Sequence, residues 1–145
     1  SRSSSLKDQE LILRFLALFF DRGKYTRPMN EFLNKFTSKA IKNGPQFTIE
    51  CRSIFENTIE AIYAALGEKA FRPERVINAA VFDSVMVGIA SRIAKGPKIS
   101  AEEICINNSK LLGDNRYLEL ISRATADENN VRERIYLSLK AFGQD

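Results

Sequence analysis

Histidine is missing from this sequence, and its absence narrows the possible chemistry more than any other feature of the composition. Histidine is the usual general base near neutral pH, the usual partner of a nucleophilic serine or cysteine, and the commonest metal ligand. The sequence therefore excludes zinc-peptidase, HNH-nuclease and catalytic-triad chemistry for this chain.

Glycine and cysteine are also scarce. The seven glycines stand singly, and none belongs to a phosphate-binding Gly-Lys-Ser/Thr loop. Cys51 and Cys105 fall on separate predicted helices, which gives neither a disulfide framework nor the spacing of a zinc site. We expect both thiols to be reduced core residues, and we expect no cofactor.

Long apolar runs are absent too. The run 11–20 is interrupted by Arg14, and the run 76–91 by Asn78 and Asp83, so neither reaches the roughly 18 residues that span a bilayer. The serine-rich residues 1–6 lack the apolar core of a secretory signal, and we interpret them as a linker or a cloning remnant. Cytoplasmic residence is the default expectation.

The residues that are present favour helices. A chain of 145 residues with 44% hydrophobic and 28% charged residues suits one globular domain. Apolar residues recur at three- and four-residue spacing, and no sustained alternation of period two is found. The pattern predicts a compact, single-domain all-α bundle of six or seven helices over residues 7–142, with a tail at 143–145. The expected helices are 6–21, 28–43, 48–66, 76 to the break at Gly96-Pro97, 100–112, 117–121 and 125–142.

Polar residues mark several expected helix starts. Thr48, Ser100 and Thr125 are predicted N-caps, the last two in a Ser/Thr-x-x-Glu arrangement. The acidic pairs Glu102-Glu103 and Asp127-Glu128 are the candidates for binding magnesium. Because both pairs lie in predicted first turns, where caps and the helix dipole explain them, we expect no metal site.

Two charged residues lie in otherwise apolar helices. The stretch 76–91 is apolar nearly all round, so its helix is predicted at the centre of the bundle, yet it contains Asp83. Arg14 interrupts the first helix in the same way. Either Arg14 extends its head to solvent while Asp83 accepts local hydrogen bonds, or the two side chains pair. We hypothesise a structural ion pair between Arg14 and Asp83 across helices one and four.

The basic residues only slightly outnumber the acidic ones, by 22 to 18. This imbalance is no nucleic-acid signature by itself. Lys35, Lys39 and Lys42 form a stripe on the predicted second helix, which is either a solvated face or a contact for nucleic-acid phosphates or a partner. A second set of basic residues expected on the surface consists of Arg123, Arg132 and Arg134.

Several segments, taken in order along the chain, resemble a known family. They are KDQELILRFLAL at 7–18, MNEFLNKF at 29–36, AFR at 70–72, VFDSVMV at 81–87, and Thr125 followed by VRERI at 131–135. Together they resemble the helical C-terminal part of the GmrSD-type restriction family. The similarity spans residues 7–142, nearly the whole chain.

The resemblance implies a context rather than a reaction. In that family an N-terminal ParB/sulfiredoxin-like domain, marked by an Asp-Gly-Gln-Gln-Arg motif, binds and hydrolyses nucleotide, often with an HNH nuclease domain beyond it. This sequence has neither the motif nor a histidine, so no catalytic residue is carried over to it. The implied context is defence against foreign or modified DNA, with this chain contacting the nucleotidase-like domain or a partner subunit.

Three functions therefore remain open. The preferred one is a non-catalytic helical support and interaction module, either a fragment of a larger protein or a natural stand-alone domain. It predicts an exposed apolar patch where the partner docks. The alternative is a DNA-binding module that uses the lysine and arginine faces, and an enzyme acting alone comes third.

Overall fold

The structure, a computed structural model, describes residues 2–96 and 98–143, and these residues form helices joined by loops and turns. For residues 2–6 only the backbone is described, and Pro97 and most of the expected tail at 143–145 lie outside the described residues. The described part contains α1 (Arg2–Asp21), η1 (Arg22–Lys24), α2 (Met29–Asn43), α3 (Pro45–Leu66), η2 (Gly67–Lys69), α4 (Ala79–Lys95), α5 (Ala101–Leu112), α6 (Asn115–Leu120) and α7 (Glu128–Phe142). The prediction of an all-α bundle is confirmed.

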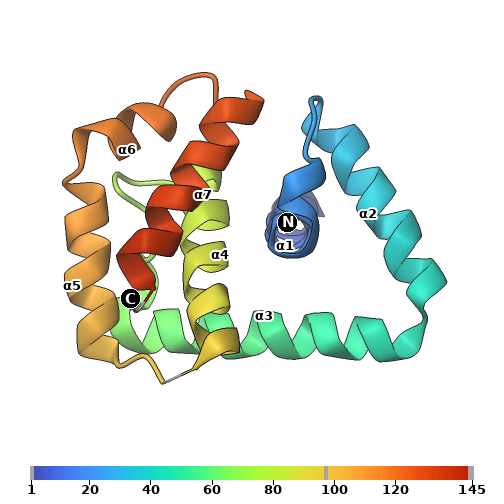
Figure 1. Cartoon of the computed structure of the whole chain (residues 1–145), viewed down its shortest axis with the longest axis horizontal. Coiled ribbons are helices and arrows are strands. Elements are labelled where there is room, and N and C mark those ends of the chain that lie inside the picture. Colours follow the sequence, from blue (N-terminus) through green and yellow to red (C-terminus); the bar gives the residue numbers. More distant parts are fainter. Residues whose placement is uncertain (1, 97, 144–145) are drawn as a thin grey trace.

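The helices are arranged around α4 (Figure 1). α7 stands beside α4, and α1, seen nearly end-on in Figure 1, packs against α4. α3 runs along the base of the bundle and contacts α2, α4 and α5, while α6 connects α5 to α7. None of the helices in the described part has the length and apolar character that crossing a membrane requires.

The central position of α4 follows from its composition, as predicted. Every residue from 80 to 90 is buried, because this helix is apolar on nearly all sides. Gly88 allows α7 to approach closely, since a Cβ at this position would overlap Ser138 Oγ and lie 3.1 Å from the Phe142 ring. The α4–α7 interface therefore depends on a residue without a side chain.

An aromatic cluster joins α1 to α2 and to the first half of α3. Its six rings are those of Phe15, Phe19, Phe20, Phe36, Phe47 and Phe55. Phe20 lies at its middle, with ring centroids 5.0 Å from Phe47 and 6.2 Å from Phe36. Such pairs stabilise beyond the apolar area that they bury. The cluster fixes the inner face of α2 and so leaves its lysines outside.

Both cysteines are free. Cys51 is buried, and burial raises the pKa of its thiol. Cys105 is half-buried, and its Sγ donates to the carbonyl oxygen of Ala65 at 3.1 Å. Cys51 lies in the core, as expected for both cysteines, and Cys105 lies at its edge.

The first and third helices begin earlier than predicted. The backbone of residues 2–6 continues α1, which was predicted to begin at Leu6, and Ser1 lies outside the described residues. The interpretation of residues 1–6 as a linker or a cloning remnant stays a prediction. Adding a residue to an existing helix gains one hydrogen bond for each residue fixed, so helices extend easily. α3 begins at Pro45 with Gly44 as its N-cap, not at Thr48, because proline suits a first turn.

The fourth helix begins three residues later than the expected Val76. Asn78 is its N-cap, and its Oδ1 accepts from the amides of Ala80 at 2.9 Å and Val81 at 3.1 Å. The segment before Asn78 is consequently a surface loop.

Of the other predicted helix starts, the cap at Ser100 is confirmed, since its side chain accepts from the amide of Glu103. The N-cap of α7 is Asp127 instead of Thr125, because the Asp127 carboxylate reaches two amides of the first turn. Pro28 is the N-cap of α2, one residue ahead of the expected first-turn position.

Replacing Gly88 tests the close approach of α4 and α7. We expect Gly88→Ala to lower the free energy of unfolding by about 1–3 kcal/mol, because the added methyl group overpacks the interface. Gly23→Ala is the matched control, since its Cβ would meet nothing within 4 Å and should change stability by less than about 0.5 kcal/mol. Urea unfolding measures both, and an unchanged midpoint for Gly88→Ala would contradict the packing.

Candidate functional site

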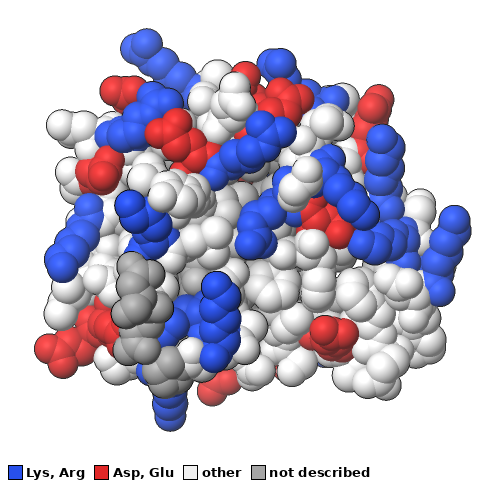
Figure 2. Space-filling view, in the orientation of Figure 1, with Lys and Arg blue, Asp and Glu red and all other residues white. Residues whose placement is uncertain are grey.

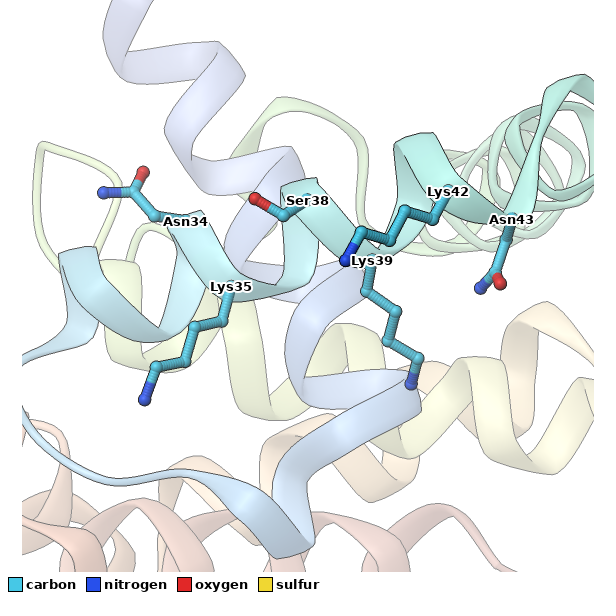
Figure 3. A pocket seen from close by; sticks show the side chains of 6 residues that line it. All are labelled: Asn34, Lys35, Ser38, Lys39, Lys42 and Asn43. Atoms are coloured by element: carbon cyan, nitrogen blue, oxygen red, sulfur yellow. The ribbon is translucent and has the colours of Figure 1, made fainter.

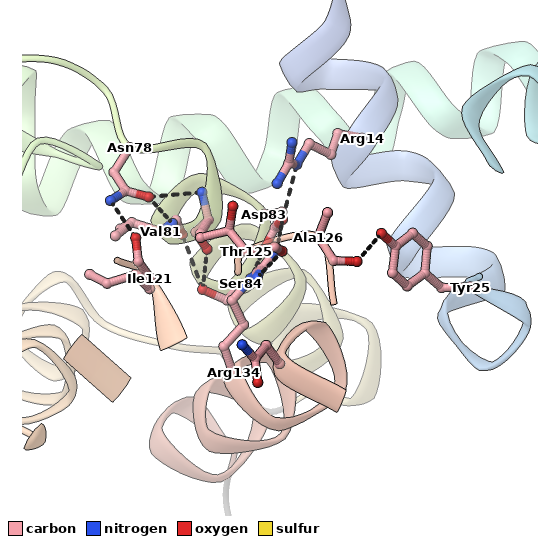
Figure 4. A network of polar contacts seen from close by, with 12 residues as sticks. Arg14, Tyr25, Asn78, Val81, Asp83, Ser84, Ile121, Thr125, Ala126 and Arg134 are labelled. Carbon is pink, nitrogen blue, oxygen red and sulfur yellow. Dashed lines mark hydrogen bonds and ion pairs between the residues drawn. The ribbon is translucent and has the colours of Figure 1, made fainter. Parts of the chain in front are cut away.

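One buried carboxylate receives hydrogen bonds from two arginines on different helices (Figure 4). Asp83 of α4 is fully buried. Arg134 of α7 donates from Nε to Oδ1 at 3.0 Å and from Nη2 to Oδ2 at 2.7 Å. Arg14 of α1 donates from Nε to Oδ2 at 3.1 Å. The carboxylate thus ties α1 and α7 to the central helix.

The structure brings Arg14 and Asp83 together across α1 and α4, as hypothesised. Asp83 has a second partner, Arg134, which donates two hydrogen bonds to it and which sequence analysis placed elsewhere. Arg134 was expected on the surface, and this is wrong because the residue is fully buried. Its position supplied a usable signal, since Val131, Arg134, Ile135 and Ser138 share the buried face of α7 at three- and four-residue spacing. Arg123 and Arg132 are exposed, as expected.

The remaining donors of this cluster are also used or solvated. Nη1 of Arg134 donates to the carbonyl oxygen of Thr125 at 2.6 Å. The Arg14 side chain keeps 13% of its surface exposed, so water screens part of the second positive charge. A buried ion pair without such satisfied partners would be strongly unfavourable. The arrangement fixes the positions of α1, α4 and α7 relative to one another.

Three side chains fasten the loop between α6 and α7. Besides the bond from Arg134 to Thr125, Tyr25 Oη donates to the carbonyl oxygen of Ala126 at 2.5 Å, and Asn78 Nδ2 donates to that of Ile121 at 3.0 Å. Burial, and then the nearby Glu128 carboxylate, raise the pKa of Tyr25. The loop is held by polar contacts from the N-cap of α4, from α7 and from the chain before α2.

A second polar clamp lies at the end of α4. Arg92, almost fully buried, donates to both Glu103 oxygens, at 2.5 and 3.2 Å, and to the carbonyl oxygen of Phe142 at 2.9 Å. The hydrogen bond from Arg92 lowers the pKa of Glu103. Glu103 therefore pairs with α4, and this clamp closes the lower end of the α4–α7 pair.

Three of the four acidic residues considered for magnesium have other roles in the structure, and Glu102 is exposed in the first turn of α5. Glu103 belongs to the clamp just described, Asp127 caps α7, and Glu128 pairs with Arg27 at 2.9 Å. Within the described residues, no three acidic or cysteine side chains gather in a way that could hold a metal ion.

The lysine stripe lies on the outer face of α2 (Figure 3). A shallow hollow there is lined by Lys35, Lys39 and Lys42, with Asn34, Ser38 and Asn43 between them. Lys39 Nζ pairs with Asp21, at 2.8 Å from Oδ1, and the walls contain no acidic side chain. Figure 2 shows basic side chains along this edge of the molecule. The sequence predicted this face, and the structure adds the contact with Asp21.

A groove that sequence analysis did not anticipate runs between α1, the end of α3 and the loop before α4. Two hollows, of about 360 and 560 Å³, share Arg72 and Ile77 in their walls. We call this surface the Arg72 groove; its apolar walls include Leu11, Ile59, Tyr63, Val76 and Ile77, and its charged residues are Lys7, Asp8, Glu68, Arg72 and Arg75. The signal for it was Val76, which the helical pattern assigned to the core. Val76 is 77% exposed, and Tyr63 is 61% exposed.

Removing the shared carboxylate tests the cluster at the centre of the bundle. We expect Asp83→Ala to lower the free energy of unfolding by about 3–5 kcal/mol, because a buried guanidinium loses its counter-charge. Glu60→Ala, at an exposed acidic residue of α3, is the control and should change stability by less than about 0.5 kcal/mol.

A triple variant separates charge from packing. Arg14→Met, Asp83→Leu and Arg134→Met together leave no buried charge in the cluster, so this protein should be more stable than Asp83→Ala. Urea denaturation followed by circular dichroism measures all three proteins. Equal stability of Asp83→Ala and Glu60→Ala is the result that contradicts a structural role for Asp83.

Comparison with known proteins identifies no relative of this chain. No family model matches the chain, and no curated protein or solved structure matches it either.

Proposed function

We propose that this chain is a helical support and interaction module that docks on a partner domain or subunit through the Arg72 groove. The observation that carries the proposal is the exposure of Tyr63 and Val76, two large apolar side chains, in the walls of the groove. Exposed apolar surface with a polar rim is typical of protein interaction sites. The other large exposed apolar residues, such as Ile41 and Tyr136, lie outside these walls.

The proposed setting is a restriction, or phage-defence, protein of the GmrSD type that acts on foreign or modified DNA. Two of the segments that resemble that family, 7–18 and 70–72, contribute residues to the groove. A nucleotidase-like domain joined ahead of α1 would be tethered beside Lys7, Asp8 and Leu11, which raises its effective concentration at the groove. The chain itself would position that domain without a catalytic role.

The natural reading frame ahead of Leu6 provides the first test. A frame that encodes a domain with the Asp-Gly-Gln-Gln-Arg motif supports the proposed setting, whereas a start codon directly ahead of Leu6 contradicts it. In the longer protein that such a frame would encode, we expect slower amide hydrogen exchange over residues 7–11 and 70–77 than in the 145-residue chain, because docking buries this surface. Exchange over α2, which lines neither hollow of the groove and lies at the opposite end of α3 in Figure 1, is the control and should not change. Equal exchange of the groove in both proteins would count against docking there.

The lysine face of α2 supports a second candidate function, the binding of duplex DNA. Lys35 and Lys42 are exposed and have no acidic partner among the described residues, so their charges are available to phosphates. Only two or three phosphates would be neutralised in this way. DNA binding through this face is therefore weak and independent of sequence.

The salt dependence of DNA binding tests this candidate. We expect the logarithm of the association constant to fall with the logarithm of the salt concentration with a slope of about −2 to −3, because each neutralised phosphate contributes about −0.9. Lys35→Ala with Lys42→Ala should make the slope shallower by about 2, whereas Lys110→Ala on α5 should leave it unchanged. Fluorescence anisotropy with a labelled duplex measures it. Equal slopes for the wild-type and double-variant proteins would remove α2 as the DNA-binding face.

A further inference from the structure

The loop that forms one wall of the Arg72 groove is fixed at both ends. Phe71 is buried with its ring centroid 4.7 Å from that of Phe82, although its φ of 66° is unfavourable for a bulky residue. Asn78 donates from its amide to the carbonyl oxygen of Phe71 at 2.9 Å and also caps α4. A strained conformation persists only where its surroundings determine it, and such positions cluster at ligand clamps. The contacts of Phe71 and Asn78 thus hold the loop that contains Arg72, Arg75 and Val76 in place.

The charges of the groove are unbalanced around Arg72. The larger hollow has three basic side chains in its walls, Lys7, Arg72 and Arg75, and one acidic side chain, Asp8, while the smaller hollow adds Glu68, so the groove has three basic and two acidic side chains. Within the described part of the chain, neither arginine has an ion-pair partner. Arginines with ion-pair partners occur elsewhere at positions 14, 27, 92, 116 and 134. The side of the groove that contains Arg72 and Arg75 is therefore complementary to a ligand with negative charge.

The apolar walls indicate which kind of anionic ligand fits. The hollow between Tyr63, Phe71 and Ile77 offers contacts to a large apolar side chain, which a phosphate backbone does not possess. Arg72 lies in the walls of both hollows, so one ligand can fill the apolar hollow and meet the guanidinium at the same time. A guanidinium binds a carboxylate through two parallel hydrogen bonds.

We infer that the Arg72 groove binds an acidic segment of a partner protein that anchors one large apolar side chain beside Tyr63. This inference rests on the proposed interaction function and specifies the chemistry of the partner. The carboxylates of the segment meet Arg72 and Arg75, and its apolar side chain packs against Tyr63 and Ile77. An apolar anchor with charged groups at its rim is a common composition of protein interfaces.

Selection from a random peptide library displayed on phage tests the inference with the 145-residue chain as bait. We expect enriched peptides to combine Asp or Glu with Phe, Leu, Ile or Trp. Affinities of the synthesised peptides are then measured by isothermal titration calorimetry. Arg72→Glu with Arg75→Glu should weaken binding about tenfold or more, because two attractive charges become repulsive. Lys35→Glu with Lys42→Glu is the matched control: it changes net charge equally on α2 and should leave the affinity unchanged.

Two further variants test the apolar part of the groove. Tyr63 and Val76 are exposed, so Tyr63→Ala and Val76→Ala should leave the fold intact and still weaken peptide binding. Thermal unfolding of each variant checks that it folds. Binding that depends on the arginines and not on Tyr63 or Val76 would overturn the apolar anchor.

Three further results would overturn the inference. They are a library without enriched peptides, enriched peptides that are basic or lack apolar residues, and duplex DNA or a second copy of the chain competing with the peptides at the groove. Slower hydrogen exchange of the groove in the proposed longer protein, together with failed peptide selection, would retain docking at the groove and reject its acidic partner. Unchanged exchange together with successful selection would reject docking of the tethered domain and retain the binding of an acidic segment from another partner.

Discussion

The Asp83 carboxylate is removed from water at the centre of the bundle, and it is tolerable there only because two guanidinium groups reach it. The desolvation of such an ion costs several kcal/mol, and the attraction of its partners roughly offsets that cost. The cluster therefore adds little net stability, yet any other arrangement of α1 and α7 leaves a buried charge unpaired. We interpret it as the constraint that selects one packing of three helices.

This constraint extends to the surface. Arg14 follows Leu11 by one helical turn, so the contact with Asp83 also sets where the outer part of α1 lies. Leu11, Lys7 and Asp8 form the α1 side of the Arg72 groove. The facing wall is fixed by Phe71 and Asn78, whose contacts lead to the same central helix. Both walls of the proposed docking surface are thus positioned by α4, which gives a ligand a preformed site.

Sequence reasoning was most successful where one residue type had one dominant physical role. The apolar periodicity of α4 placed that helix at the centre, and the isolation of Arg14 and Asp83 among apolar neighbours suggested their contact. It failed for Arg134, because an arginine on a half-polar helix looks like a solvated residue unless its face is worked out from the spacing. Sequence reasoning also failed for Val76, because an apolar residue next to an apolar helix is expected in the core. The helix is capped at Asn78, so Val76 lies outside it and is exposed. The groove depends on tertiary proximity of segments about 60 residues apart, which periodicity does not report.

The separation of Asp83 from its two arginines along the chain also determines the order in which parts of the fold can form during synthesis. Arg14 precedes Asp83 by 69 residues and Arg134 follows it by 51, so a ribosome releases the carboxylate long before its bidentate partner. Until α7 emerges, the surface of α4 that surrounds Gly88 has no helix to cover it. Contacts between distant segments form late and leave apolar surface open to aggregation in the meantime. The nascent chain therefore cannot complete its core before its last helix is synthesised.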